Sequence, residues 1–131
     1  MSNLPEFEIS AAHALTRLQA TLAFADSGPE ASRIALYDAA ELLLVTLTLT
    51  KPCGQIAEGG YLVLTQASGS GEMILASGQA ATGVWSTSDG KLIGRGLVTD
   101  EAGAGHFKLL GSTGTQLYAG GKAILGETRI D

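Results

Sequence analysis

Charged residues are scarce in this sequence. Of its 131 residues only 16% are Asp, Glu, Lys or Arg, whereas an ordinary globular domain has about 25%. The formal net charge is −5, and a protein that binds nucleic acid needs a basic surface to meet the phosphates. We therefore expect no nucleic-acid partner.

Cysteine and histidine are too rare to support the usual metal and thiol chemistry. Cys53 is the single cysteine, so no disulfide can form within the chain, and its sequence neighbours supply no base to activate a thiol. His13 and His106 are the two histidines, and with one cysteine they fall short of the three or four closely spaced ligands of a zinc site. The sequence predicts no metal and no cofactor.

Catalytic motifs are also missing. The sequence has no G-x-S-x-G elbow, no G-x-G-x-x-G turn and no G-x-x-x-x-G-K-[ST] loop. Asp100 and Glu101 open a glycine-containing loop and fit solvated turn positions. Serine, histidine and aspartate all occur, but a triad is assembled in space, so their presence alone carries no information. We predict no catalytic residue and expect that the protein is not an enzyme.

No membrane segment or secretory leader is visible. The first residues contain neither a basic stretch nor an apolar core. Threonines interrupt the longest apolar run at every second position, so no segment is long enough to cross a bilayer. These features predict synthesis in a cytoplasm and no membrane partner.

Apolar residues, by contrast, are plentiful. They make up 45% of the chain, which is enough for one core without disulfides or metals. We expect a single domain over 1–131, with an N-terminal arm and helix at 1–28 and a β-sandwich at 29–131. Apolar side chains recur every three or four residues between about 10 and 24, which predicts an amphipathic helix that Ser10 caps and Gly28-Pro29 ends.

The rest of the chain has the period of β-strands. In 42–50, leucine and valine alternate with threonine, which is typical of a half-buried strand. Pro52-Cys53-Gly54 is expected to end this strand, and Gly120-Gly121 to mark a bulge. Similar runs predict further strands at 33–37, 61–66, 73–77, 80–87, 92–99, 106–110, 116–125 and 128–130. The predicted fold class is mainly β: an antiparallel β-sandwich or jelly-roll-like domain with one N-terminal amphipathic helix.

This pattern offers more apolar surface than so small a domain is expected to hide. Obligate interfaces resemble a core cut in half, and a low charge content suits such contacts. We predict that the chain forms a homo-oligomer or packs tightly against other subunits. The predicted interface residues are Leu15, Leu18 and Leu22 on the helix, and Trp85 on a strand.

Several stretches resemble a family of small proteins from tailed bacteriophages and prophages. The resemblance lies in the run 33–54, the helix before it that ends in Asp26-Ser-Gly-Pro, and the stretches Gly60-Tyr-Leu-Val-Leu-Thr and Gly78-Gln-Ala-Ala-Thr-Gly-Val-Trp. It implies a non-enzymatic virion structural protein, located in the virion, with other virion proteins as partners. A tail-tip or tail-fibre position is expected. The alternatives are a capsid-decorating protein and a receptor- or glycan-binding β-sandwich module.

Overall fold

A short amphipathic helix precedes the strands. The computed structural model describes residues 9–111 and 113–130, and its helix α1 spans Ala11–Ala25. The Ser10 hydroxyl accepts a hydrogen bond from the His13 amide at 3.1 Å, so the predicted N-cap is confirmed. At the other end, the Asp26 amide donates to the Leu22 carbonyl, and Gly28-Pro29 turns the chain towards the first strand.

Eleven strands follow, and nine of them form one sheet. Its order is β11-β3-β2-β1-β6-β7-β8-β10-β4, and β5 and β9 form a separate two-stranded ribbon. All pairs are antiparallel except β7 with β8. The strands are β1 Arg33–Tyr37, β2 Leu43–Ala57, β3 Tyr61–Gln66, β4 Glu72–Met73, β5 Gly78–Gln79, β6 Thr82–Ser86, β7 Leu92–Asp100, β8 Phe107–Leu110, β9 Gln116–Leu117, β10 Lys122–Leu125 and β11 Thr128–Ile130.

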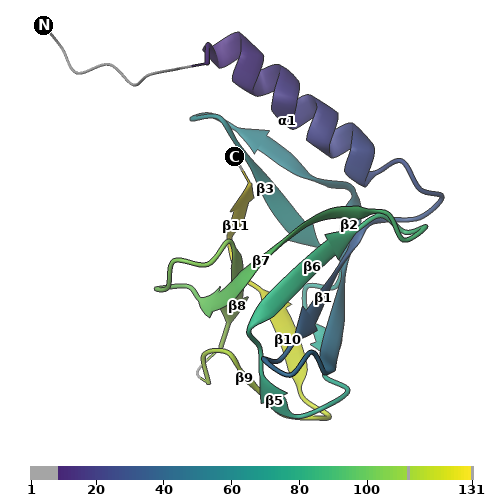
Figure 1. Cartoon of the computed structure of the whole chain (residues 1–131), viewed down its shortest axis with the longest axis vertical. Helices are drawn as coiled ribbons and strands as arrows, with labels where there is room; N and C mark the ends of the chain where they lie inside the picture. Colours follow the sequence, from purple (N-terminus) through teal and green to yellow (C-terminus); the bar gives the residue numbers. More distant parts are fainter. Residues whose placement is uncertain (1–8, 112, 131) are drawn as a thin grey trace, which may run out of the picture.

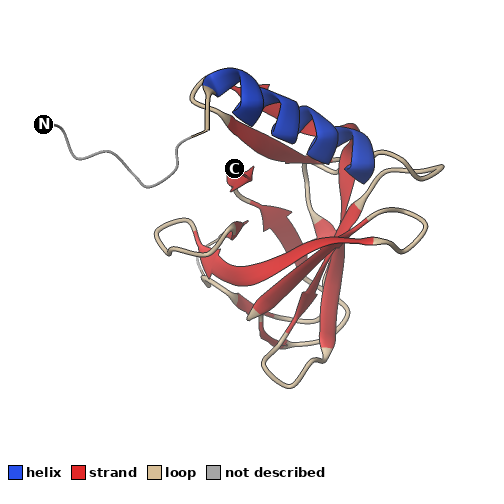
Figure 2. Cartoon of the chain, turned by 45° about the horizontal axis from the view of Figure 1, so that its top comes forward, coloured by secondary structure: helices blue, strands red, loops and turns tan. Residues whose placement is uncertain are grey.

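The sheet curls so far that its C-terminal strands return to its beginning (Figure 1). Strand β10 pairs with β8, and two residues later β11 pairs with β3 at the far end of the strand order. The two sides of the curl enclose one core, and α1 lies across one end of it (Figure 2). The expected fold class, a mainly β, antiparallel, sandwich-like domain with one N-terminal helix, is thereby confirmed.

Strand β2 carries much of the core. Leu47 and Leu49 are fully buried while Thr48 between them is exposed, as the alternation in the sequence predicts. The expected end of this strand at Pro52-Cys53-Gly54 is wrong. The strand runs on to Ala57, and its pairing with β3 shifts between Leu49 and Gly54. Proline is accommodated at such a bulge because no ladder hydrogen bond is needed there.

Two other strand predictions also need correction. The predicted strand at 116–125 is divided into β9 and β10, because Gly120, with φ +88°, makes a turn whose amide bonds to the Ile74 carbonyl. Of the predicted 73–77 strand, only Met73 lies in β4. The amide of Leu75 instead bonds to the Leu44 carbonyl.

The parallel pair of β7 and β8 has an unusually short connection. Parallel strands are ordinarily joined by a dozen or more residues, yet only residues 101–106 separate these two. The paired stretch is three residues long, from Val98↔Phe107 to Asp100↔Leu109, so the loop has to return only about 10 Å. Gly105 makes the return possible, since a Cβ there would lie 2.6 Å from the Leu97 carbonyl oxygen.

Candidate functional site

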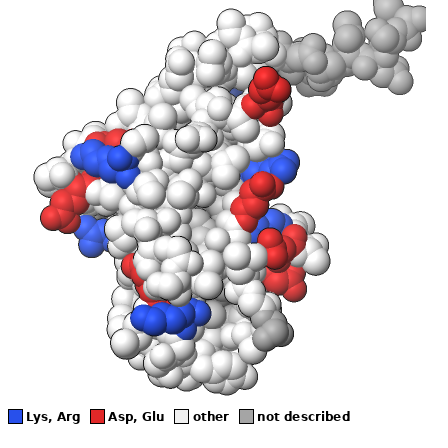
Figure 3. Space-filling model, turned by 180° about the vertical axis from the view of Figure 1, so that it is seen from behind, with Lys and Arg blue, Asp and Glu red and all other residues white. Residues whose placement is uncertain are grey.

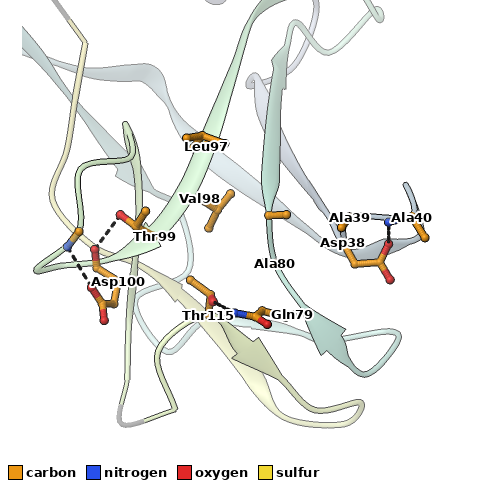
Figure 4. Close-up of a pocket in the computed structure, with 12 residues that line it drawn as sticks. Asp38, Ala39, Ala40, Gln79, Ala80, Leu97, Val98, Thr99, Asp100 and Thr115 are labelled. Atoms are coloured by element: carbon orange, nitrogen blue, oxygen red, sulfur yellow. Dashed lines mark hydrogen bonds between the residues drawn. The ribbon is translucent and has the colours of Figure 1, made fainter.

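Strand β7 borders two hollows of the surface, and the larger one lies where β6 and β7 separate. Thr82 of β6 is paired with Leu97 of β7, but beyond Leu97 β7 turns to β8. The groove that opens there has a volume of about 800 Å³. Ala80, Leu97 and Val98 supply apolar surface, and the β5–β9 ribbon crosses its far end (Figure 4). We call it the β6–β7 groove.

Most polar side chains that line the β6–β7 groove form hydrogen bonds with neighbouring residues of its walls. Asp38 Oδ1 accepts hydrogen bonds from the amides of Ala40 and Leu42, both at 2.9 Å. Asp100 Oδ1 likewise accepts from two amides of the loop that follows it, at 3.1 and 3.0 Å. Gln79 Nε2 donates to Thr115 Oγ1 at 3.3 Å. The second oxygen of each carboxylate accepts no hydrogen bond from the described residues, so it is free to meet a hydroxyl or an amine.

The lining of the β6–β7 groove offers hydrogen-bonding groups. A nucleophilic site requires a nucleophile within hydrogen-bond reach of a base. No such pair lines the β6–β7 groove among the residues that the structure describes. Its chemistry is that of hydrogen-bond acceptors beside alanine and leucine side chains.

The second hollow lies beneath α1 and has a volume of about 490 Å³. We call it the helix slot. Most of its lining is apolar, and Arg95 and His106 are its titratable residues. The side chains and backbone around it are Ala20, Thr21 and Phe24 of α1, Trp85 of β6, Ile93, Gly94 and Arg95 of β7, and His106, Phe107 and Ile130.

Strand edges border the helix slot on two sides. Before Val98, β7 pairs only with β6, and its other edge has no strand partner among the described residues. Strand β11 pairs with β3 and stands at one end of the sheet order. Unpaired strand edges expose backbone amides and carbonyls that readily accept another strand. The slot is thus an apolar hollow with unused backbone hydrogen-bonding groups nearby.

A third hollow is lined by charged residues, and two of them form an ion pair, Arg129 with Glu127. The Arg129 guanidinium donates to Glu127 at 2.8 Å through Nε and stacks 4.4 Å from the Tyr61 ring centre. The hydrogen bond that Arg129 donates to Glu127 raises the pKa of Arg129 above its ordinary value. The Lys108 ammonium donates to the Gly103 carbonyl. These contacts fasten β11 and the 101–106 loop.

Cys53 is unsuited to be a nucleophile. Its side chain is fully buried, and burial, reinforced by the carboxylate of Asp26, raises the pKa of the thiol from 9.0 to about 12. The Cys53 amide donates to Asp26 Oδ2 at 3.3 Å, which ties the end of α1 to the kink in β2. The residue is part of the core.

The structure separates the four predicted interface residues. Leu18 and Trp85 are 4% and 2% exposed, so both side chains pack in the chain's own core, and Trp85 also lines the helix slot. Leu22 is half-buried against that core. Leu15 is 44% exposed and remains available. Spacing along a helix or strand identifies Leu18 and Trp85 as apolar positions, but it does not show which neighbours their side chains contact.

The residues that line the two hollows were not recognised from the sequence. Asp38 and Asp100 sit in turns whose Asx pattern is visible locally, but their common groove depends on the separation of β6 from β7. Phe24 and Ile93 are ordinary apolar residues in sequence, and only the curl of the sheet brings them together. His13 lies on the exposed side of α1, far along the chain from His106 at the helix slot.

Among the described residues no three His, Cys, Asp or Glu side chains come together as a metal-binding group. The helix of the described chain is too short to span a membrane. Comparison with known proteins gives no relative: no protein-family model, no curated protein and no solved structure matches this chain.

Proposed function

We propose that this chain is a non-enzymatic structural subunit of a tailed-bacteriophage virion, associated with the tail tip or tail fibre. Its role is to hold subunits together through contacts with copies of itself and with other virion proteins. The sequence resemblance supplies the virion context. The observation that carries the assembly role is the helix slot, an apolar hollow bordered by strand edges that have no strand partner among the described residues.

The surrounding surface supports this role. Leu92 and Leu97, on the open half of β7, are 48% and 67% exposed. On the opposite side of the molecule, seen from behind β6 and β7 of Figure 1, charged side chains are few and lie mainly near the margins (Figure 3). Interfaces between permanent subunits are depleted in charge at their centres. Such a surface favours protein contacts over an exposed position in solvent.

Quantitative mass spectrometry of purified particles tests the proposal. We expect the chain in intact virions, at a copy number close to that of tail-tip or fibre proteins. A copy number like that of the major capsid subunit would favour capsid decoration instead. Complete absence from purified particles, with the chain present in the infected-cell lysate, would refute the virion assignment.

Glycan binding is a second candidate because of the β6–β7 groove. Asp38 and Asp100 each leave one carboxylate oxygen for a hydroxyl, and Gln79 and Thr115 add polar groups between them (Figure 4). A glycan array with the intact protein tests this function. The expected signal disappears in Asp38→Asn and Asp100→Asn, and it persists in Glu58→Gln, a change at an exposed turn outside the groove. Equal signals from all variants would refute groove binding.

A further inference from the structure

We infer that the helix slot receives residues 6–9 of a second copy of this chain as an added strand beside β7. The inference rests on the proposed assembly function and identifies the contact through which copies would join. It follows from the shape of the slot, the sequence of the N-terminal residues and the length of chain between them.

The helix slot has open space at Gly94, where an added strand would place its side chains. Gly94 is paired with the buried Trp85, so it lies on the inner side of β7, because residues paired across a ladder share a face. A Cβ built on Gly94 finds no heavy atom within 4 Å. Apolar side chains from a neighbouring strand can therefore enter above Trp85 and Phe107, both of which line the slot.

The N-terminal sequence has the alternation that this position requires. Residues 6–9 read Glu-Phe-Glu-Ile, so in an extended strand Phe7 and Ile9 share one face and the two glutamates share the other. Pro5 directly precedes them, at a position where a strand tolerates proline. With Phe7 and Ile9 turned into the slot, Glu6 and Glu8 lie on the outer face of the sheet.

The charge on that outer face complements the glutamates. Arg95 neighbours Gly94 and therefore points to the opposite, outer side of β7, where it is exposed. It makes no ion pair with another described residue. Opposite charges on neighbouring strands stabilise a sheet, so Arg95 favours an acidic added strand in spite of the negative net charge of the chain.

The distances keep the backbone of the chain's own residues 7–9 from lying beside β7 at the slot. Ile9 lies with Ala14, Arg17 and Leu18 near the start of α1, whereas the slot meets α1 from Ala20 onward. Ser10 and Ala20 are about 15 Å apart along the helix. Phe7 lies at most about 10 Å from Ser10 even when the chain is extended. We therefore assign the added strand, with its Phe7 and Ile9, to another copy, which joins β7 by β-augmentation.

Sedimentation velocity of the full-length chain over a range of concentrations tests the inference. We expect the wild type to self-associate. Phe7→Asp, which removes the aromatic anchor, and Gly94→Leu, which fills the slot, should each weaken association by roughly 30-fold. The matched controls are Thr16→Asp, on exposed α1 surface outside the slot, and Gly69→Leu, at a turn glycine with equally open surroundings. Both controls should associate like the wild type, and circular dichroism should show that every variant is folded.

Exchanging the charges of Glu8 and Arg95 tests whether these two residues face each other in the proposed contact. Glu8→Lys and Arg95→Glu should each weaken association, and the double variant should recover most of it. A wild type that stays monomeric at every concentration, or unchanged association in Phe7→Asp and Gly94→Leu, would overturn the inference. Equal loss in the Thr16→Asp control would also overturn it, because association would then depend on the surface of α1 outside the slot. Virions that incorporate Phe7→Asp at the wild-type copy number would refute the added strand while leaving the virion proposal intact. If the wild-type chain self-associates but is absent from virions, the virion proposal is refuted and the added strand is not.

Discussion

The indole N–H of Trp85 donates a 3.1 Å hydrogen bond to the hydroxyl of Ser32 inside the fold. Both residues are buried, Ser32 completely, so water does not compete for this bond. A buried donor that loses its acceptor costs about 1–3 kcal/mol. We expect Ser32→Ala to lower the free energy of unfolding by that amount, as measured by urea denaturation. The same change in a Trp85→Phe background should cost much less, because no indole donor is left unpaired.

We expect only the buried side of helix α1 to contribute to the stability of the fold. Leu18 is 4% exposed and Leu15 is 44% exposed. Leu18→Ala should therefore lower the free energy of unfolding by about 2–5 kcal/mol, while Leu15→Ala should change it by no more than about 0.5 kcal/mol. Thermal denaturation of the two variants makes the comparison. Similar losses in both would contradict the packing of α1 described above.

A side chain at Gly83 is predicted to lower the stability of the fold for steric reasons. A Cβ at Gly83 would lie 2.6 Å from Phe107 Cδ2, so the ring, itself buried, would have to move. Gly83→Ala should destabilise the fold by about 1–3 kcal/mol. The control is Gly94→Ala on the adjacent strand, where the added methyl meets open space, and its stability should be unchanged or slightly increased. Chemical denaturation distinguishes the two.

The Cys53 thiol should make the protein less stable in alkali. Its pKa is about 12 in the folded chain against an ordinary 9.0, so between these values the unfolded chain has lost a proton that the folded chain keeps. Stability that the protonated thiol contributes is fully present below pH 9 and is lost as the pH rises towards 12. Cys53→Ala should flatten this part of the stability–pH curve. An identical slope in the variant would contradict the buried thiol.

The helix slot was not foreseeable from local sequence, although several elements were. Ser10 caps α1, and the strands at 33–37, 61–66 and 128–130 have the predicted bounds, because caps and alternation depend on neighbouring residues. The continuation of β2 through Pro52 was missed, since a proline that ends most strands is tolerated where the ladder is already interrupted. The parallel pairing of β7 with β8 was also missed. Strand pairing depends on which distant segments meet in space. The contact between Gly83 and Phe107, for example, cannot be recognised from the sequence around either residue.

The bent C-terminal segment formed by β10 and β11 has a consequence for the order of biosynthesis. Residues 128–130 complete the curl by pairing with β3, which left the ribosome some 65 residues earlier. Until then, the outer edge of β3 has no native partner on that side. A nascent chain would pass through a stage in which most of the sheet is available and still open. Ribosome-bound chains that end before β11 should therefore be more sensitive to proteases than the released protein.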